Sequence, residues 1–236
     1  MKFGKLGIIV LALLVLVAGC IKDKTTTQTR NLTPQEIYEK IENATEFGAI
    51  WNVTIIVNGT EFASGIGYSI FTGDDMRTFR ESRGEKGLKW ESYSYINWSN
   101  NQGELRVIMK VGNQSKKFSD KKNFNATIAK SMAYPKGELY LLLSKEANFG
   151  KSNHTTSCKD DTCIVSITRE EGVPFKEMKG NVTIIKGKVK RVSLTAKTEK
   201  GEIEVLNIEF VYPEDPKWEE LKRILKEKEA VFEGKQ

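Results

Sequence analysis

The sequence predicts an α+β domain in which helices cap an antiparallel sheet. Apolar and polar residues alternate with period two over most of the chain, and turn-forming residues separate the alternating segments, as expected for neighbouring antiparallel strands. Apolar residues at helical spacing occur near the start, in the middle and at the end of the domain. An apolar content of 39% and a charged content of 29% are typical of a soluble globular body.

The first expected helix covers residues 34–43 and begins with a capping box. The Thr33 side chain can accept a hydrogen bond from the free amides of the first turn, and Pro34 suits the first helical position. Glu36 can in turn accept from the Thr33 backbone amide. These local signals predict a helix that starts at Pro34.

Strand periodicity begins at Trp51, and Asn58-Gly59 predicts a tight hairpin after the first strand. The expected strands cover residues 51–58, 62–71, 76–83, 88–98, 105–111, 163–168, 181–186, 188–197 and 202–212. Residues 148–161 are expected to form a polar loop that contains the single histidine, His154.

Three further helices are expected. Residues 125–132 and 137–145 predict two short helices in the middle of the chain, of which the second carries Leu139, Leu142 and Leu143. Pro213 and Pro216 end the sheet, and residues 216–230 show the apolar spacing of an amphipathic helix that closes the domain.

The N-terminal twenty residues indicate export. Two lysines precede an apolar run over residues 6–18, which as a helix would rise only about 20 Å and is too short for a stable membrane span. The ending Val17-Ala18-Gly19-Cys20 resembles the prokaryotic lipobox. That resemblance implies that the Cys20 thiol receives a lipid and becomes the mature N-terminus. The alternatives are a plain signal peptide that ends near a cysteine, or an uncleaved anchor.

The expected organisation is a signal peptide over 1–19, a lipidated tether over 20–32 and a single domain over 33–236. The tether is polar and rich in threonine, so we expect it to be disordered. Lipidation predicts that the protein lies at the outer face of the cell membrane, with the membrane itself as one partner.

The order of the elements resembles the LolA-like and LppX/LprG-like lipoprotein carriers. The likeness spans residues 34–212 and includes the closing hairpin, in which strand 188–197 is followed by strand 202–212. It implies a curved antiparallel sheet, a half-barrel with capping helices, around a cavity for a hydrophobic ligand. The sequon density and the extra C-terminal helix depart from that pattern.

Cys158 and Cys163 remain as a pair once Cys20 is assigned to lipid. Outside the cell a disulfide is the natural state of two nearby thiols, so we predict a structural disulfide. A redox or metal role is the alternative, although the spacing is not that of a Cys-x-x-Cys site.

Nine of the fourteen asparagines lie in Asn-x-Ser/Thr sequons. Such repeated use indicates an N-glycosylated exterior, and together with the lipobox it indicates an archaeal cell surface. The expected glycosylation sites are Asn31, Asn43, Asn52, Asn58, Asn97, Asn113, Asn125, Asn153 and Asn181. Two of these sites are the weakest: Asn31, whose sequon Asn31-Leu32-Thr33 is followed by Pro34, and Asn97, which is followed by Trp98.

No residue set predicts a catalytic chemistry, a cofactor or a metal site. The formal net charge of +6 includes lysine clusters near residues 116–122 and 186–191, which we interpret as solvated faces, with attraction to an anionic membrane as the alternative. An exported protein is not expected to bind nucleic acid.

The leading hypothesis is therefore a non-enzymatic, lipid-anchored surface protein that binds or carries a hydrophobic ligand, such as a lipid. Several strands are apolar on both faces, and such a sheet needs cover on both. The candidate ligand-binding residues are Trp51, Val53, Ile55, Leu139, Leu142 and Leu143. The main alternative is a structural or interaction protein of the cell envelope or surface layer, and the third is an extracellular hydrolase with an unrecognised carboxylate site.

Overall fold

The computed structural model describes residues 32–111, 114–123, 136–172 and 174–233. The chain divides into two compact units, Met1–Arg30 and Asn31–Gln236, and only the second contains described residues. Several predicted features therefore lie outside the described residues. They are Cys20, the expected tether up to Asn31, the sequons at Asn113 and Asn125, and the helix expected over 125–132.

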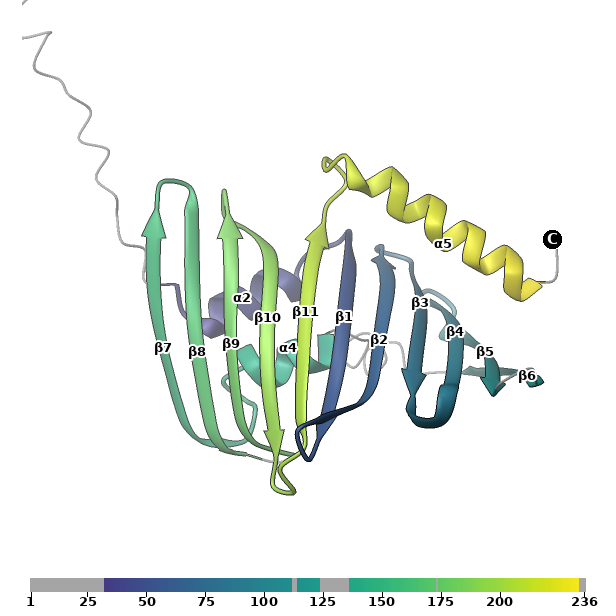
Figure 1. The fold of residues 1–236 in the computed structure, drawn as a ribbon. Coiled ribbons are helices and arrows are strands. Elements are labelled where there is room, and N and C mark those ends of the chain that lie inside the picture. Colours follow the sequence, from purple (N-terminus) through teal and green to yellow (C-terminus); the bar gives the residue numbers. More distant parts are fainter. Residues whose placement is uncertain (1–31, 112–113, 124–135, 173, 234–236) are drawn as a thin grey trace, which may run out of the picture. The chain divides into compact units, whose positions relative to one another are not determined.

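Eleven strands form one antiparallel sheet in the order β6-β5-β4-β3-β2-β1-β11-β10-β9-β8-β7 (Figure 1). Two meanders, β1 to β6 and β7 to β11, are joined where β1 pairs with β11. The strands are β1 Phe47–Val57, β2 Thr60–Phe71, β3 Asp75–Gly84, β4 Leu88–Asn97, β5 Gln102–Val111, β6 Gln114–Asn123, β7 Phe149–Lys159, β8 Thr162–Gly172, β9 Phe175–Ile185, β10 Lys188–Thr198 and β11 Ile203–Val211. The sheet is open, with β6 and β7 at its two edges.

The described helices are α2 (Pro34–Glu42), α4 (Lys136–Leu143) and α5 (Lys217–Glu233), with one 3₁₀ turn, η1 (Glu85–Gly87). Helix α2 has the predicted capping box: the Glu36 amide donates to Thr33 Oγ1 at 3.3 Å, and the Thr33 amide donates to Glu36 Oε2 at 2.8 Å. Antiparallel strands with capping helices are thus confirmed, although strand predominates more than the sequence suggested.

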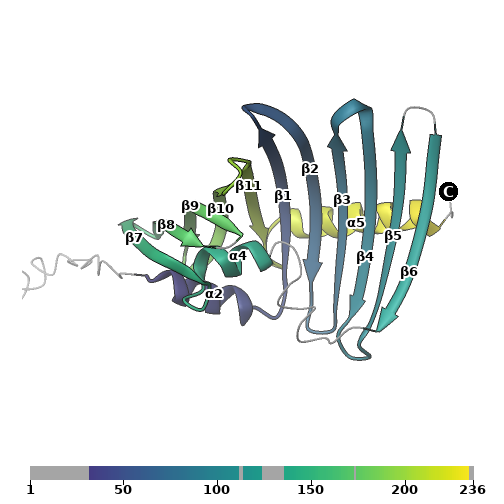
Figure 2. The same cartoon turned by 90° about the horizontal axis from the view of Figure 1, so that it is seen from below.

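The helices cover opposite faces of the sheet. Trp51 and Val53 point from β1 into a core that includes side chains of α2 and α4, and we call this side the inner face. The alternate residue Gly48 lies against α5, where an added Cβ atom would be 2.3 Å from Leu221, and we call this side the outer face. Figure 2 shows α5 behind β1 to β6, while α2 and α4 lie in front of the opposite part of the sheet.

We divide the sheet into a tether-side half, β7 to β11 with β1, and a far half, β2 to β6. The name reflects the entry of the chain, because the Leu32 carbonyl accepts a hydrogen bond from Thr156 Oγ1 of β7 at 3.2 Å. The sheet twists between the halves: β7 to β11 are seen broadside in Figure 1, and β3 to β6 are seen broadside in Figure 2.

The prediction of a polar loop over residues 148–161 is wrong, since most of that segment is β7. Strand β6 was not predicted at all, and β9 begins at Phe175 rather than at residue 181. Both β6 and β7 are edge strands with largely exposed side chains, so neither needs an apolar face. Each of these two strands forms because its backbone hydrogen-bonds to one neighbouring strand. Such bonds do not require apolar and polar residues to alternate, so the sequence shows no strand period there.

The remaining elements agree with prediction within a few residues. Helix α4 confirms the short helix expected over 137–145, and α5 confirms the amphipathic helix expected over 216–230. None of the described helices is both long and apolar enough to cross a bilayer.

Candidate ligand-binding face

The residues predicted to bind a ligand lie mostly inside the protein core. Trp51, Val53, Leu139, Leu142 and Leu143 expose between 0 and 4% of their surfaces and belong to one cluster. The fit is close, because a Cβ atom added at Gly180 of β9 would lie 2.6 Å from Leu142 of α4. Ile55 is half-buried. These side chains fill the inner face of the tether-side half with the protein's own atoms, so they form its wall rather than an open surface.

Trp51 marks the border between the two halves of the inner face. Its ring lies over β2, where a Cβ atom added at Gly67 would come within 1.9 Å of the indole. The indole Nε1 donates to Ser69 Oγ at 3.4 Å, and the Arg80 guanidinium lies 5.6 Å from the ring centre. Glycine at position 67 therefore allows the indole to rest directly on the neighbouring strand.

Beyond this border, the inner face of the far half carries exposed apolar side chains. Leu105 and Met109 of β5 are 44% and 40% exposed, and Phe118 of β6 is 45% exposed. Register places them together, since Phe118 pairs with Val107, which lies between Leu105 and Met109, and Met109 pairs with Trp90 of β4. Directly paired residues of antiparallel strands share one face. We call Trp90, Leu105, Val107, Met109 and Phe118 the apolar patch.

The apolar patch lies on the same face as Trp51. Trp51 pairs with Gly67, Gly67 with Arg80, Arg80 with Ser92, and Ser92 with Val107, in one cross-strand row. The helix α5 packs against the opposite face of β2, β3 and β4. The patch therefore faces the side of the far half that α5 does not cover (Figure 2).

Two carboxyl groups and a guanidinium meet at the border. Burial raises the pKa of Glu138 on α4 to about 7, and the negative charge of Glu204 on β11 adds to this, while a hydrogen bond to the backbone and the charge of Arg80 on β3 oppose it. Burial also raises the pKa of Glu204, against the opposing charge of Arg80. The Oε2 atom of Glu138 is buried and has no hydrogen-bond partner. Glu138 can therefore bind and release a proton near neutral pH, a property that the sequence did not indicate.

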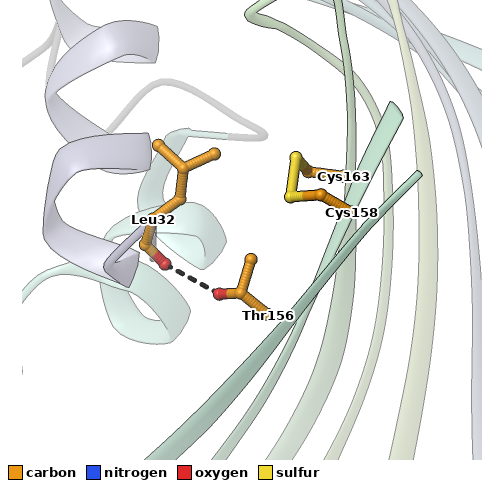
Figure 3. Close-up of a disulfide and its surroundings, with 4 residues drawn as sticks. All are labelled: Leu32, Thr156, Cys158 and Cys163. Carbon is orange, nitrogen blue, oxygen red and sulfur yellow. Dashed lines mark hydrogen bonds between the residues drawn. A yellow bond between two sulfur atoms is a disulfide. The ribbon is translucent and has the colours of Figure 1, made fainter. Parts of the chain in front are cut away.

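The Cys158 and Cys163 sulfur atoms are 2.06 Å apart, which is the length of a disulfide bond (Figure 3). The two residues pair directly across β7 and β8, with their Cα atoms 4.0 Å apart. Figure 3 also shows the Leu32–Thr156 hydrogen bond beside the disulfide. The disulfide thus closes the edge hairpin close to Leu32, at the start of the described chain.

Among residues 32–111, 114–123, 136–172 and 174–233, no three His, Cys, Asp or Glu side chains form a group that could hold a metal ion. His154, the single histidine, is exposed on β7. A hollow of about 450 Å³ at the start of α5 includes Lys190 and Asp215, which are paired at 2.8 Å. Four of its charged side chains already form ion pairs, Lys190 with Asp215 and Lys217 with Glu209, so it is a weaker candidate than the apolar patch.

The described sequons lie at the surface. Asn43, Asn52, Asn58, Asn153 and Asn181 are exposed, and Asn97 is half-buried. They occur in three settings: Asn43 caps the end of α2, Asn58 lies in the β1–β2 turn with φ 52°, and the other four lie in strands.

Comparison with known proteins adds little. No family model matches the chain, and no curated protein matches it. A solved structure, a β-barrel-like protein of the domain of unknown function DUF1849 from Brucella abortus, aligns with 71% of this chain and 98% of its own. The two are 9% identical, with a TM-score of 0.31.

Proposed function

We propose that this chain is a lipid-anchored, glycosylated cell-surface protein that binds a hydrophobic ligand on the apolar patch, without bond chemistry. The observation that carries the proposal is the adjacency of Leu105, Met109 and Phe118, each at least 40% exposed on one face of two neighbouring strands. Single exposed apolar residues are ordinary, whereas a contiguous group of large ones indicates a binding surface.

The two covered faces suggest how such a site is built. Helices α2 and α4 fill the inner face of the tether-side half, and the inner face of the far half continues from Trp51 towards the apolar patch. We propose that the twisted sheet acts as a half-barrel of the LolA-like kind, with its ligand on the far half. In this arrangement Trp51, Val53 and the leucines of α4 support the site from the core.

The chemistry around the patch suits an amphiphile. The Lys116 ammonium lies 5.1 Å from the centre of the Phe118 ring, at the outer margin of the patch. An apolar chain would bury the patch, at roughly 25 cal/mol for each Å² removed from water, and an anionic head group would lie near Lys116. A fatty acid or an anionic lipid meets both requirements.

The N-terminal segment supports a place at the membrane. Lipid on Cys20 would hold the domain through a tether whose polar part, residues 21–30, reaches at most roughly 35 Å. Changing Cys20 to Ser is expected to release the protein from the membrane fraction. Full retention of the variant would show that the apolar run over 6–18 is itself the anchor.

The binding experiment uses the purified protein and parinaric acid, a fatty acid whose fluorescence rises in apolar surroundings. We expect Leu105→Asp to weaken binding at least tenfold, because a carboxylate in the contact loses hydration without gaining a partner. Ile164→Asp is the matched control, since Ile164 is 45% exposed but lies on the outer face of β8. Extraction of the wild-type protein with organic solvent should also release a bound lipid.

The main alternative is a structural protein of the cell envelope that uses the same patch to contact a partner protein. If no lipid is extracted and parinaric acid does not bind the wild-type protein, the carrier proposal is wrong and the envelope protein replaces it. If Leu105→Asp and Ile164→Asp weaken binding equally, the ligand does not bind at the apolar patch.

A further inference from the structure

Three sequons lie wholly within strands, and the geometry of a strand determines where each of their residues points. The sequon asparagines are Asn52 on β1, Asn153 on β7 and Asn181 on β9, and each is followed two residues later by threonine. Because side chains alternate between the faces, the asparagine and its threonine share one face and the middle residue takes the other. Val53 and Val182 accordingly lie in the core at 4% and 0% exposure, while Asn52 and Asn181 are exposed.

All three asparagines lie on the outer face of the tether-side half. Asn52 pairs with Asn207, Asn207 with Ser193, and Ser193 with Asn181, so Asn52 and Asn181 occupy one cross-strand row. They are three strands apart, or about 14 Å. Asn153 lies two strands beyond β9 in the next row of outward residues, opposite Thr168.

Asn52 and Asn181 each accept a hydrogen bond that does not involve Nδ2, the atom to which a glycan would be attached. Asn207 Nδ2 donates to Asn52 Oδ1 at 3.1 Å, and Ser166 Oγ donates to Asn181 Oδ1 at 2.7 Å. Both bonds engage the oxygen of the sequon amide. An N-linked glycan is attached to the amide nitrogen, Nδ2, so neither bond has to break.

Asn97 is the opposite case. Its Nδ2 donates to the Tyr95 hydroxyl at 3.3 Å, and its Oδ1 accepts from the Ser99 and Asn100 amides at 3.0 and 3.1 Å. The side chain is half-buried and holds the turn after β4. Both ends of this amide are therefore engaged in the folded protein.

We propose that Asn52, Asn153 and Asn181 carry N-linked glycans that together shield the outer face of the tether-side half, and that Asn97 is unmodified. A transferase outside the chain would join Nδ2 of each asparagine to the anomeric carbon of a lipid-phosphate-linked oligosaccharide. The bond between that carbon and the phosphate oxygen breaks, the lipid phosphate leaves with the electron pair, and Nδ2 loses a proton. This inference rests on the export included in the proposed function.

Shielding would complete the cover of the outer face. Helix α5 packs on the outer side of β2, β3 and β4, but the outward residues Ser166, Lys179, Ser193 and Asn207 of the tether-side half are exposed. Three glycans spaced by roughly 12–14 Å can cover the surface between them. The apolar patch, on the inner face of the far half, stays clear of all three.

The first test is mass spectrometry of glycopeptides from the full-length protein, purified from the membrane fraction of its native host. We expect sugar on Asn52, Asn153 and Asn181 and none on Asn97. Thr54→Val should abolish modification of Asn52, whereas Thr54→Ser, which keeps the hydroxyl that a sequon requires, should preserve it. Asn207→Gln is the matched control. Asn207 lies in the same cross-strand row but in no sequon, so this change removes the hydrogen bond to Asn52 and leaves the Asn52 sequon intact.

The second test measures the shield itself. Acetylation of the Lys179 amine, which lies on the outer face between the sequons, should be several-fold faster after Asn52, Asn153 and Asn181 are all changed to Gln. Lys117 of β6 is also exposed but lies on the far edge, so its rate should not change.

Each outcome is decisive. Unmodified Asn52, Asn153 and Asn181 on protein whose Cys20 carries lipid would overturn the glycan proposal and leave the surface location intact. Sugar on Asn97 would overturn the rule that amide hydrogen bonding selects the sites. Equal rates of Lys179 acetylation in the glycosylated wild type and in the triple variant would overturn the proposal that the glycans shield this face. Loss of parinaric acid binding in Leu105→Asp tests the proposed ligand site separately.

Discussion

The two halves of the sheet are built from the same alternating strands but are covered on opposite faces. In the tether-side half, α2 and α4 pack on the inner face, and the outer face is mostly polar, with Ile164 and Ile185 as exposed apolar residues. In the far half, Phe79 and Tyr93 of the outer face pack against α5 through Phe232, and the inner face carries the apolar patch.

This difference separates the residues that stabilise the fold from those proposed to bind a ligand. Most large apolar residues of the tether-side half lie on the covered face and are nearly fully buried, while Ile164 and Ile185 are exposed on its outer face. The far half divides its apolar residues, with Phe79 and Tyr93 buried under α5 and Leu105 and Met109 exposed on the other side. Apolar residues that contribute little to folding but remain together at the surface are those expected to contact a ligand.

The largest expected effect comes from removing a wall residue of the tether-side half. Leu142→Ala should lower the free energy of unfolding by about 4 kcal/mol, because it leaves a cavity between α4 and β9. Chemical denaturation measures this loss. A cost below about 1 kcal/mol would mean that α4 is loosely docked and that the ligand site extends beneath it.

The free energy of unfolding should depend on pH because of Glu138, which lies at the border between the two halves. Its folded pKa of about 7 lies above the ordinary value of 4.5, so the contribution of this group is fully present below pH 4.5 and is lost as pH rises to about 7. The loss should reach about 3 kcal/mol. Glu138→Gln should remove most of this dependence in denaturation curves recorded from pH 4 to 8, because the amide does not ionise.

Glu204 and Arg80 both act on the Glu138 carboxyl group through their charges, so a change at Glu204 provides the control. Glu204→Gln should lower the Glu138 pKa, since it removes a nearby negative charge. A pH profile that is identical in wild type and Glu138→Gln would show that water reaches this carboxyl group freely.

Loss of the disulfide should cost about 2 kcal/mol, since it closes only a short loop between β7 and β8. Cys158→Ser with Cys163→Ser is the variant for denaturation. The wild-type protein should show no reactive thiol from either residue without reductant. Quantitative labelling of both would reopen the redox or metal alternative.

The smallest effect on stability is expected in the far half. Met109→Ser should change the free energy of unfolding by less than about 1 kcal/mol, because Met109 is 40% exposed, and it should still weaken parinaric acid binding. Measuring both properties on one variant sharpens the comparison between the halves. A loss similar to that of Leu142→Ala would show that the patch is part of the folding core.

Much of the local structure could be predicted from the sequence. The capping box of Thr33 and Glu36 depends on residues three positions apart, and the strand containing Trp51 and Val53 shows its period directly. The Cys158–Cys163 pair lies across one hairpin, five positions apart. Neighbouring residues determine these features, so a single sequence contains the information.

Only the tertiary structure decided which surfaces are covered. The pairing of β1 with β11 joins segments about 150 positions apart, and together with the packing of α4 it brings Glu138, Glu204 and Arg80 together from three distant elements. The edge strands β6 and β7 are defined by their backbone bonds to one neighbour and therefore leave no period. The sequence determined that Trp51 and Leu105 are both apolar, but the side chains packed above each decide that one is core and the other surface, because burial depends on contacts between remote parts of the chain.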